Sequence, residues 1–275
     1  MTDETPPILS GKAYDTPSAF TPESLLREAR RQKGAEIEPV PAVCLLDPDG
    51  DMVRRLLAEG RARPHEGWVC YHTDLYVFEA EGITFGIVAC AVGSAFAVLV
   101  AEELFVSGCQ LLISITSAGQ LAAPQEPPYF VLIDRAVRDE GTSYHYQPPA
   151  RHSDAPENLP GALDGAFDGL AVPVVRGAAW TTDAPFRETQ ANIDAMTAEG
   201  YLAVEMEAAA LYAFARARDR RVVCFAHVTN QMGQVEGDFE KGEAEGTHDA
   251  LALAARVAAV MWPDLPDPSV PSPGT

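Results

Sequence analysis

Residues 202–216, LAVEMEAAALYAFAR, decide the fold, and the rest of the chain is organised around them. The stretch opens with strand-like residues, places a carboxylate on each side of Met206, and continues as the alanine-rich pattern of a buried helix. Apolar residues recur there at three- and four-residue spacing, so Glu207 falls in the first helical turn, near the core. A buried carboxylate needs a hydrogen-bonding partner, and a ligand with neighbouring hydroxyls would supply two donors. The alternative is that Glu207 only stabilises the start of the helix through the helix dipole.

Strand and helix patterns alternate along the rest of the chain. Buried strands are predicted at residues 42–47, 68–80, 83–92, 111–119, 129–141, 172–183, 201–207 and 221–231, with a tight turn at Glu81 and Gly82. Helices are predicted at residues 23–34, 95–108, 186–200, 208–216 and 246–262, and a surface loop with a helix fragment at 150–170. This alternation predicts an α/β fold, a three-layer α/β/α sandwich with a central mixed sheet.

The chain of 275 residues is long enough for one large domain with a substantial core. We expect an N-terminal segment with a peripheral helix at residues 1–36, a single α/β domain at 37–262, and a proline-rich disordered tail at 263–275. Forty acidic against twenty basic residues give a formal charge of −20. Such a charge repels nucleic acid and anionic membranes, so neither is an expected partner.

The five cysteines are odd in number, widely spaced and mostly placed within apolar runs. They predict buried thiols in a reducing compartment, and neither a CxxC spacing nor a histidine cluster indicates a metal site. The N-terminal residues lack the apolar core of a signal peptide, and no apolar run has the length of a membrane span. The sequence therefore predicts a cytoplasmic protein that needs no metal and no organic cofactor.

Four motifs follow one another along the chain: ISITSAGQL at 113–121, VRDEGTSYHYQPP at 137–149, GAAWTTDAPFRET at 177–189 and VEMEAAAL at 204–211. In this order they resemble the purine nucleoside and uridine phosphorylase family, over a stretch that runs from about residue 40 to about residue 260. The resemblance implies a nucleoside phosphorylase-like sandwich and an enzyme that cleaves the N-ribosidic bond of a small-molecule nucleoside. It also implies a homo-oligomer built from dimers, up to a hexamer.

The resemblance also assigns a sugar site and a base site. Met206 would pack against the ribose and Glu207 would accept hydrogen bonds from its hydroxyls, and a carboxylate there stabilises the positive charge that develops on the ring. Glu205 and Ser117 complete the ribose-binding set, and His145 is the candidate that a neighbouring subunit would contribute. The implied base-binding residues are Ala118, Gly119, Thr182, Phe186, Arg187 and Asn230. In the uridine-specific branch an aromatic side chain stacks on the base and an arginine reaches a ring carbonyl, as Phe186 and Arg187 could do.

Asn230 departs from the purine-specific and nucleosidase branches, which carry an aspartate at this place to protonate the purine ring nitrogen. An amide donates hydrogen bonds but does not titrate in this range, so Asn230 cannot act as a general acid. The change disfavours adenosine-like substrates. It favours pyrimidine nucleosides such as uridine, or 6-oxopurine nucleosides.

The phosphate-binding arginines of the family are missing. The family's Gly-Asp-Pro-x-Arg loop matches LDPDG at 46–50, and the other two arginines match Ser114 and a position near Val77. Without these clamps phosphate should bind poorly, which disfavours it as a co-substrate. Water is therefore the expected nucleophile, with Asp49 or Asp51 as its base, unless both aspartates only form a solvated turn. The remaining nucleophile or anion pocket consists of Asp47, Gly93, Ser94 and Ser117.

Catalysis is thus assigned to Asn230, Asp49 and Glu207. The main hypothesis is hydrolysis of a nucleoside. One alternative is a phosphate-dependent phosphorylase similar to uridine phosphorylase, and a second is a noncatalytic relative that binds nucleosides. A nucleotide or a modified sugar as substrate would require a cation near the 5′ position, for which Arg138 and Arg187 are the candidates.

Overall fold

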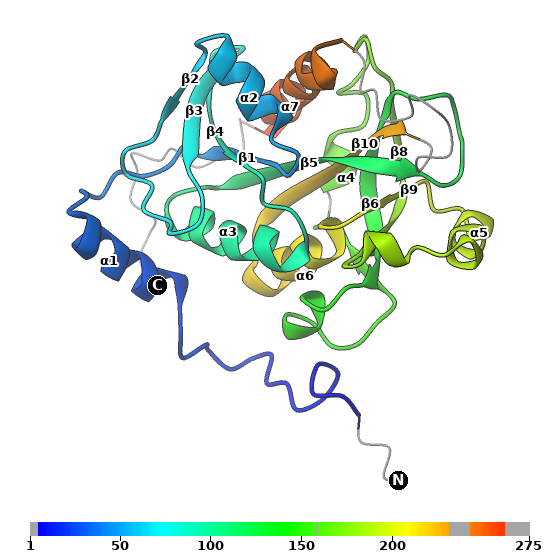
Figure 1. The fold of residues 1–275 in the computed structure, drawn as a ribbon, viewed down its shortest axis with the longest axis horizontal. Coiled ribbons are helices and arrows are strands. Elements are labelled where there is room, and N and C mark those ends of the chain that lie inside the picture. Colours follow the sequence, from blue (N-terminus) through cyan, green and yellow to red (C-terminus); the bar gives the residue numbers. More distant parts are fainter. Residues whose placement is uncertain (1–4, 158, 231–242, 262–275) are drawn as a thin grey trace.

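The computed structural model describes residues 5–157, 159–230 and 243–261. Its strands are β1 (Val43–Asp47), β2 (Ala62–Pro64), β3 (Leu75–Ala80), β4 (Ile83–Ala89), β5 (Leu111–Gln120), β6 (Tyr129–Asp139), β7 (His152–Asp154), β8 (Val174–Thr182), β9 (Ala203–Glu205) and β10 (Arg221–Asn230). Within the described residues they form one mixed sheet of ten strands (Figure 1). The strand order is β10-β6-β8-β9-β5-β1-β4-β3-β2, and β7 pairs with β6.

Helices cover both faces of this sheet (Figure 1). They are α1 (Pro22–Lys33), α2 (Asp51–Ala58), α3 (Ser94–Val106), α4 (Leu159–Ala162), α5 (Gln190–Ala198), α6 (Ala208–Arg218) and α7 (Thr247–Met261), with short 3-10 turns η1 (Ser143–His145), η2 (Pro185–Arg187) and η3 (Glu243–Gly246). Strand side chains alternate between the faces: Cys44 and Leu46 join the core under α3 and α6, whereas Val43 and Leu45 join the core under α2, α4 and α7. The predicted α/β sandwich with a mixed sheet is confirmed.

The sheet also curls back on itself. β10 pairs in parallel with β5 and antiparallel with β6, so β5, β10, β6, β8 and β9 close into a ring. The register shifts between Ile133 and Arg135 in β6, and between Val228 and Asn230 in β10, and irregularities of this kind bend strands. The sequence did not predict the closure, because alternation identifies the two faces of a strand but not its partners.

Local signals predicted two features of the chain correctly. The side chain of Thr21 accepts a hydrogen bond from the Ser24 amide at the start of α1, and the helix ends at Gly34, whose φ is 65°. Between β3 and β4, Glu81 and Gly82 form the predicted turn with φ values of 50° and 76°. Both features depend only on neighbouring residues, which the sequence displays directly.

Two predicted boundaries were clearly wrong, and two short strands were missed. The strand expected at 68–80 begins only at Leu75, because residues 68–74 form a loop in which the Trp68 indole donates to the Thr73 carbonyl at 3.0 Å. The helix expected at 186–200 begins at Gln190, where the preceding Thr189 caps it. The short strands β2 and β7 were not predicted, since three residues are too few to display an alternating pattern.

Four of the five cysteines are buried free thiols as predicted, whereas Cys90 is exposed. None of the described helices is both long enough and apolar enough to cross a membrane. The boundaries at residues 36 and 262 stay predictions, and the expected tail at 263–275 lies outside the described residues.

Candidate functional site

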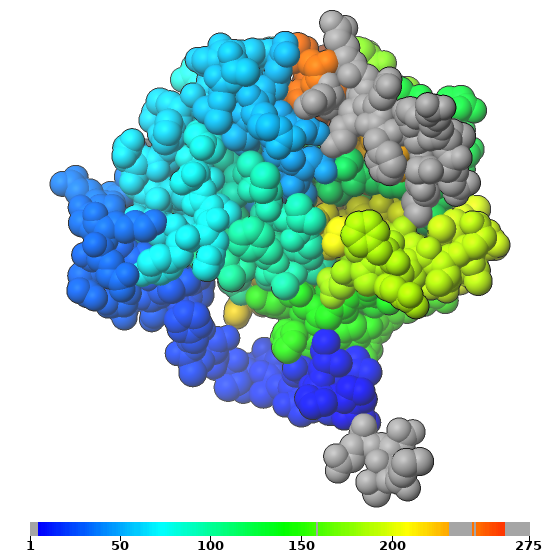
Figure 2. Space-filling view, viewed as in Figure 1, coloured from blue at the N-terminus to red at the C-terminus, as the bar shows by residue number. Residues whose placement is uncertain are grey.

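The carboxyl ends of β1, β4, β5 and β10 meet at one edge of the sheet, because these strands are parallel neighbours. The turn between β9 and α6 reaches the same edge, where the Gly93 amide donates to Glu207 Oε1 at 2.7 Å. Figure 2 shows this face hollowed between α3 and the segment of η2 and α5, with the yellow β9–α6 segment at the floor. Ligands of α/β sheets bind outside such strand ends, so this edge is the candidate site.

Glu207 is the buried carboxylate of the site, with 1% of its surface exposed. Its Oε1 accepts the Gly93 amide, whereas Oε2 has no hydrogen-bond partner among the described residues. Burial, and after it the charge of Glu205, raise the pKa of Glu207 to about 8, while the Gly93 amide acts in the opposite direction. The Thr116 hydroxyl is near enough to lower this pKa as well, but it does not meet the geometry of a hydrogen bond to Oε2. An unsatisfied buried acceptor is unfavourable. Oε2 is therefore a free acceptor at the strand edge, and the expected contact of Glu207 with ribose stays a prediction.

Gly93 and Ser94 hold the Glu207 segment from α3. Gly93 has φ 84° and ψ 151°, a backbone region that is essentially restricted to glycine. Ser94 was expected to belong to the anion pocket, and the N-cap of α3 is Gly93. Ser94 is fully buried and its hydroxyl donates to the Met206 carbonyl at 2.8 Å. Ser94 therefore positions the backbone of half-buried Met206 and is not open to an anion.

Glu205 was expected to bind ribose, but its oxygens are engaged inside the protein. One accepts the hydroxyl of Thr181, and the other accepts the amides of Glu207 and Ala208, both at 2.7 Å. Glu205 thus satisfies free amides at the start of α6. Burial raises the pKa of this carboxyl. Thr181, which also accepts the Ala209 amide at 3.0 Å, was missed by the sequence reasoning, although it lies in one of the motifs that carry the resemblance.

Asp47 is a helix cap beneath the site. It is 2% exposed and accepts the amides of Gly50 at 3.0 Å and Val53 at 2.9 Å, at the start of α2. Burial is the main cause that raises the pKa of Asp47 to about 7. Asp47 therefore fixes the loop that carries Asp49. Both of its oxygens are engaged by these amides, and its place in the expected anion pocket stays a prediction.

The raised pKa of Asp47 predicts a pH dependence of stability. Since folding raises this pKa from 3.8 to about 7, its stabilising contribution is complete below about pH 4 and is lost as pH rises through about 7. Asp47→Asn keeps a capping oxygen but removes the titration. The free energy of unfolding would be measured with urea at about pH 5 and about pH 7.5. The difference between the two pH values should be smaller in the variant than in the wild type by on the order of 2 kcal/mol. Equal pH effects in the two proteins would contradict this origin.

Asp49 reaches from the loop after β1 to the end of β5. Its Oδ2 accepts the Ser117 amide at 2.9 Å and its Oδ1 accepts the Ser117 hydroxyl at 2.8 Å. At the start of α2, Asp51 forms an ion pair with Arg54. The structure therefore brings together Asp49 and Ser117, two of the residues expected to handle the nucleophile.

Three of the expected base-binding residues lie together. Ala118 and Gly119 belong to the end of β5, and Asn230 ends β10 beside them. The Asn230 amide nitrogen donates to the Ala118 carbonyl at 3.4 Å, and Asn230 is 7% exposed. An amide group at this edge can exchange hydrogen bonds with a carbonyl or an N–H of a base.

The other three expected base-binding residues lie on or beside η2. Thr182 is 4% exposed and its hydroxyl accepts the Ala184 amide at 3.2 Å. Phe186 is fully exposed, and Arg187 next to it is also exposed. The structure therefore leaves the aromatic ring and the guanidinium at the rim, where neither is buried against the strand ends.

Arg138, one of the two candidate cations for a 5′ group, is engaged by contacts within the protein. Its guanidinium donates to the Ser143 hydroxyl at 2.8 Å and to two backbone carbonyls, and it lies over the Tyr144 ring at 4.4 Å. These contacts order the η1 turn that carries His145. His145 lies 3.1 Å from the Lys12 amine, and its contribution to another subunit stays a prediction.

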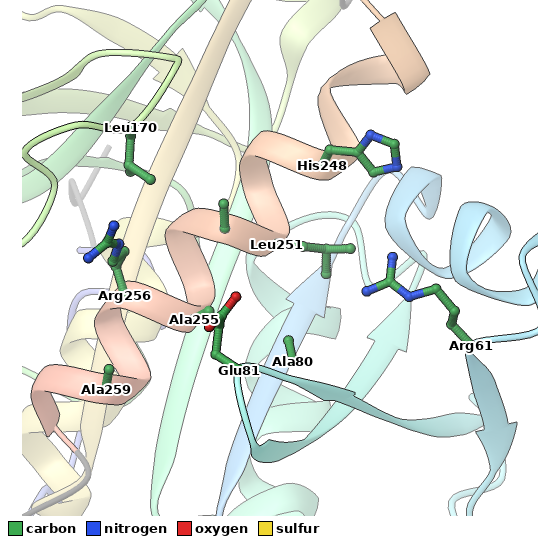
Figure 3. Close-up of a pocket in the computed structure, with 10 residues that line it drawn as sticks. Arg61, Ala80, Glu81, Leu170, His248, Leu251, Ala255, Arg256 and Ala259 are labelled. Carbon is green, nitrogen blue, oxygen red and sulfur yellow. The ribbon is translucent and has the colours of Figure 1, made fainter.

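Among the described residues, neither a cluster of metal ligands nor the cavity along α7 belongs to this strand edge. In the part of the chain that the structure describes, no three His, Cys, Asp or Glu side chains are grouped to hold a metal ion. A cavity of about 650 Å³ runs along α7, where Leu251 and Ala255 face Arg61 and Glu81 (Figure 3). Arg61 is already paired with Glu59 at 3.0 Å. None of the carboxyl ends of the parallel strands β1, β4, β5 and β10 lines this cavity, so we do not assign it to the site.

Comparisons with known proteins concern the family and the fold. A sequence model of the family described as the phosphorylase superfamily matches residues 42–261. A curated guanosine phosphorylase of Halorubrum lacusprofundi is 27% identical over 185 residues, which cover 64% of this chain and 75% of that protein.

Two crystal structures of uridine phosphorylase from Vibrio fischeri share the fold. One, a complex with 6-hydroxy-1-naphthoic acid, has a TM-score of 0.70 at 19% identity and covers 85% of this chain and 99% of its own. The other has a TM-score of 0.69 at 21% identity, with coverages of 83% and 95%. At these identities the likeness concerns the fold alone.

Proposed function

This chain belongs to the phosphorylase superfamily, and from that premise we propose that it cleaves the N-glycosidic bond of a nucleoside. The observation that carries the proposal is the unpartnered Oε2 of buried Glu207 at the strand edge. Ribose offers neighbouring hydroxyl donors that match this acceptor. The carboxylate would also stabilise the positive charge that develops on the sugar as the bond to the base breaks.

The base that we propose is a 6-oxopurine, as in guanosine or inosine, with the pyrimidine of uridine as the second candidate. Asn230 supports both, because its amide can donate to a ring carbonyl but cannot protonate a ring nitrogen. The name of the guanosine phosphorylase relative supports the purine, and the names of the similar solved structures support uridine. Adenosine lacks the ring carbonyl and fits least well.

For the attacking group we propose phosphate, because the relatives are named as phosphorylases. An oxygen of phosphate would form the bond to the anomeric carbon while the bond to the base breaks, and the products would be a sugar 1-phosphate and the free base. The expectation that water replaces phosphate finds no support in these relatives. The homo-oligomer and the cytoplasmic location stay predictions.

Water is retained as a second candidate because of one specific contact. Asp49, the expected base for water, holds both hydrogen-bond donors of Ser117. A carboxylate at the strand end can activate water. The same carboxylate disfavours a phosphate dianion beside it, since like charges repel.

The sugar product distinguishes the two candidates. Purified protein would be incubated with guanosine, with and without inorganic phosphate, and the sugar identified by ion-exchange chromatography. If phosphate is the nucleophile, the sugar product is a sugar 1-phosphate, and the base is released only when phosphate is present. Free ribose formed at the same rate without phosphate would reject phosphate as the nucleophile in favour of water.

A further inference from the structure

Ser117 presents two hydrogen-bond donors to a single carboxylate. The two Asp49 oxygens lie 2.9 Å from the Ser117 amide nitrogen and 2.8 Å from its hydroxyl oxygen. Both residues are partly buried, which limits screening of the contact by water. An N–H and an O–H that hold two oxygens of a carboxylate can hold two oxygens of a phosphate in the same way.

The cavity that Asp49 and Ser117 line is small. The cavity there has a volume of about 20 Å³, which is room for about one water molecule. In the part of the chain that the structure describes, no lysine or arginine lines it. A phosphate could therefore reach Ser117 only after the Asp49 side chain has moved away.

The loop that carries Asp49 is fixed to the start of α2 by a different residue. The amides at the start of that helix are capped by Asp47, at 3.0 Å to Gly50 and 2.9 Å to Val53. A change at Asp49 therefore leaves this cap in place. The contact with Ser117 is an interaction across the site and not a requirement of the helix start.

We propose that Asp49 is a built-in competitor of phosphate at Ser117, and that it thereby sets how strongly the site prefers phosphate over water. The inference rests on the proposed function, since it concerns the nucleophile of nucleoside cleavage. Phosphate must displace the carboxylate before it can attack, whereas water can enter beside it. Removal of the carboxylate should free both donors of Ser117 and strengthen phosphate binding.

The test is calorimetric titration of inorganic phosphate into the wild type and Asp49→Ala. The variant is expected to bind phosphate about tenfold more tightly, because two donors that can make charge-assisted hydrogen bonds become free. Asp49→Asn, which keeps the shape but not the charge, should show a smaller gain of the same sign. Adding Ser117→Ala to Asp49→Ala should cancel most of the gain.

Glu59→Gln is the control for the loss of one negative charge, because Glu59 ends α2 and does not line the cavity beside Ser117. It should change phosphate affinity less than about threefold. An unchanged affinity in both Asp49 variants would overturn the proposal, and so would an equal gain in Glu59→Gln. The titration needs no turnover, so its failure is distinguishable from failure of the proposed function, which base release by the wild type decides.

Discussion

Glu207→Gln is expected to lower kcat/KM for nucleoside cleavage by about 100-fold to 1000-fold, because two charge-assisted hydrogen bonds to the ribose are lost. The glutamine oxygen can still accept the Gly93 amide, which Glu207 accepts at 2.7 Å. Its NH₂ group then replaces the unpartnered Oε2 and faces the hydroxyl donors of the sugar with a further donor. Initial rates of base release measure the effect.

Glu103→Gln is the matched control for this prediction. Glu103 lies in α3, is 2% exposed, and has a pKa raised by burial, but both of its oxygens lack partners among the described residues and it lines no strand end. The variant should keep wild-type kcat/KM. A similar loss of activity in the two variants would show that burial of a charge, and not contact with the sugar, explains the result.

Glu207 also predicts a pH profile. Burial raises its pKa to about 8, so a large share of the carboxyls is protonated at neutral pH in the free enzyme. Ribose hydroxyls donate better to the ionised form, so kcat/KM should rise with pH up to about 8. The free energy of unfolding should depend on pH in the opposite direction. The stabilising contribution of Glu207 is complete below about pH 4.5 and is lost as pH rises through about 8, because folding raises the pKa of this carboxyl. Both dependences should flatten in Glu207→Gln.

Glu205→Ala is expected to lower the free energy of unfolding by about 3–5 kcal/mol, because it leaves buried donors without an acceptor. The donors are the Thr181 hydroxyl and the amides of Glu207 and Ala208. Loss of this cap also frees the turn that holds Glu207, so activity should fall together with stability. Urea unfolding followed by circular dichroism gives the first quantity and base release gives the second.

Glu205→Gln distinguishes the effect of losing the hydrogen-bond acceptor from the effect of losing the whole side chain. Its amide oxygen can still accept the two backbone amides, and its NH₂ group can donate to Thr181, so a loss of only about 1–2 kcal/mol is expected. If Glu205→Ala unfolded at the same urea concentration as the wild type, Glu205 would not be the cap that these hydrogen bonds indicate.

Residue types that are unusual in their local pattern made part of the site predictable. Two carboxylates at the start of an apolar helix marked residues 205–207, and Glu207 is indeed buried beside Gly93. The same pattern could not assign different roles to Glu205 and Glu207. Those roles depend on two residues that are distant in the sequence. The strand register brings Thr181 opposite Glu205, and the start of α3 brings Gly93 next to Glu207.

Contacts between distant parts of the chain explain most of what the sequence did not reveal. Asp49 and Ser117 were both candidates for the nucleophile pocket, but nothing in their surroundings indicated that they bond to each other. The closed ring of strands was hidden for the same reason, because the pairing of β10 with both β5 and β6 depends on strands far apart in sequence. The local sequence pattern determines which face of a strand or helix is buried and where the element ends. Tertiary packing determines which strands and side chains become its partners.

The central claim is that the strand edge around Glu207 and Asn230 cleaves nucleosides that carry an oxo group on the base. Its most direct test is chromatographic measurement of free base from guanosine, inosine, uridine and adenosine, each incubated with purified protein and inorganic phosphate. We predict base release from guanosine, inosine or uridine, with adenosine about 100-fold slower because Asn230 cannot act as a general acid. Release of no base from any of the four, or adenosine as the fastest substrate, would contradict the account.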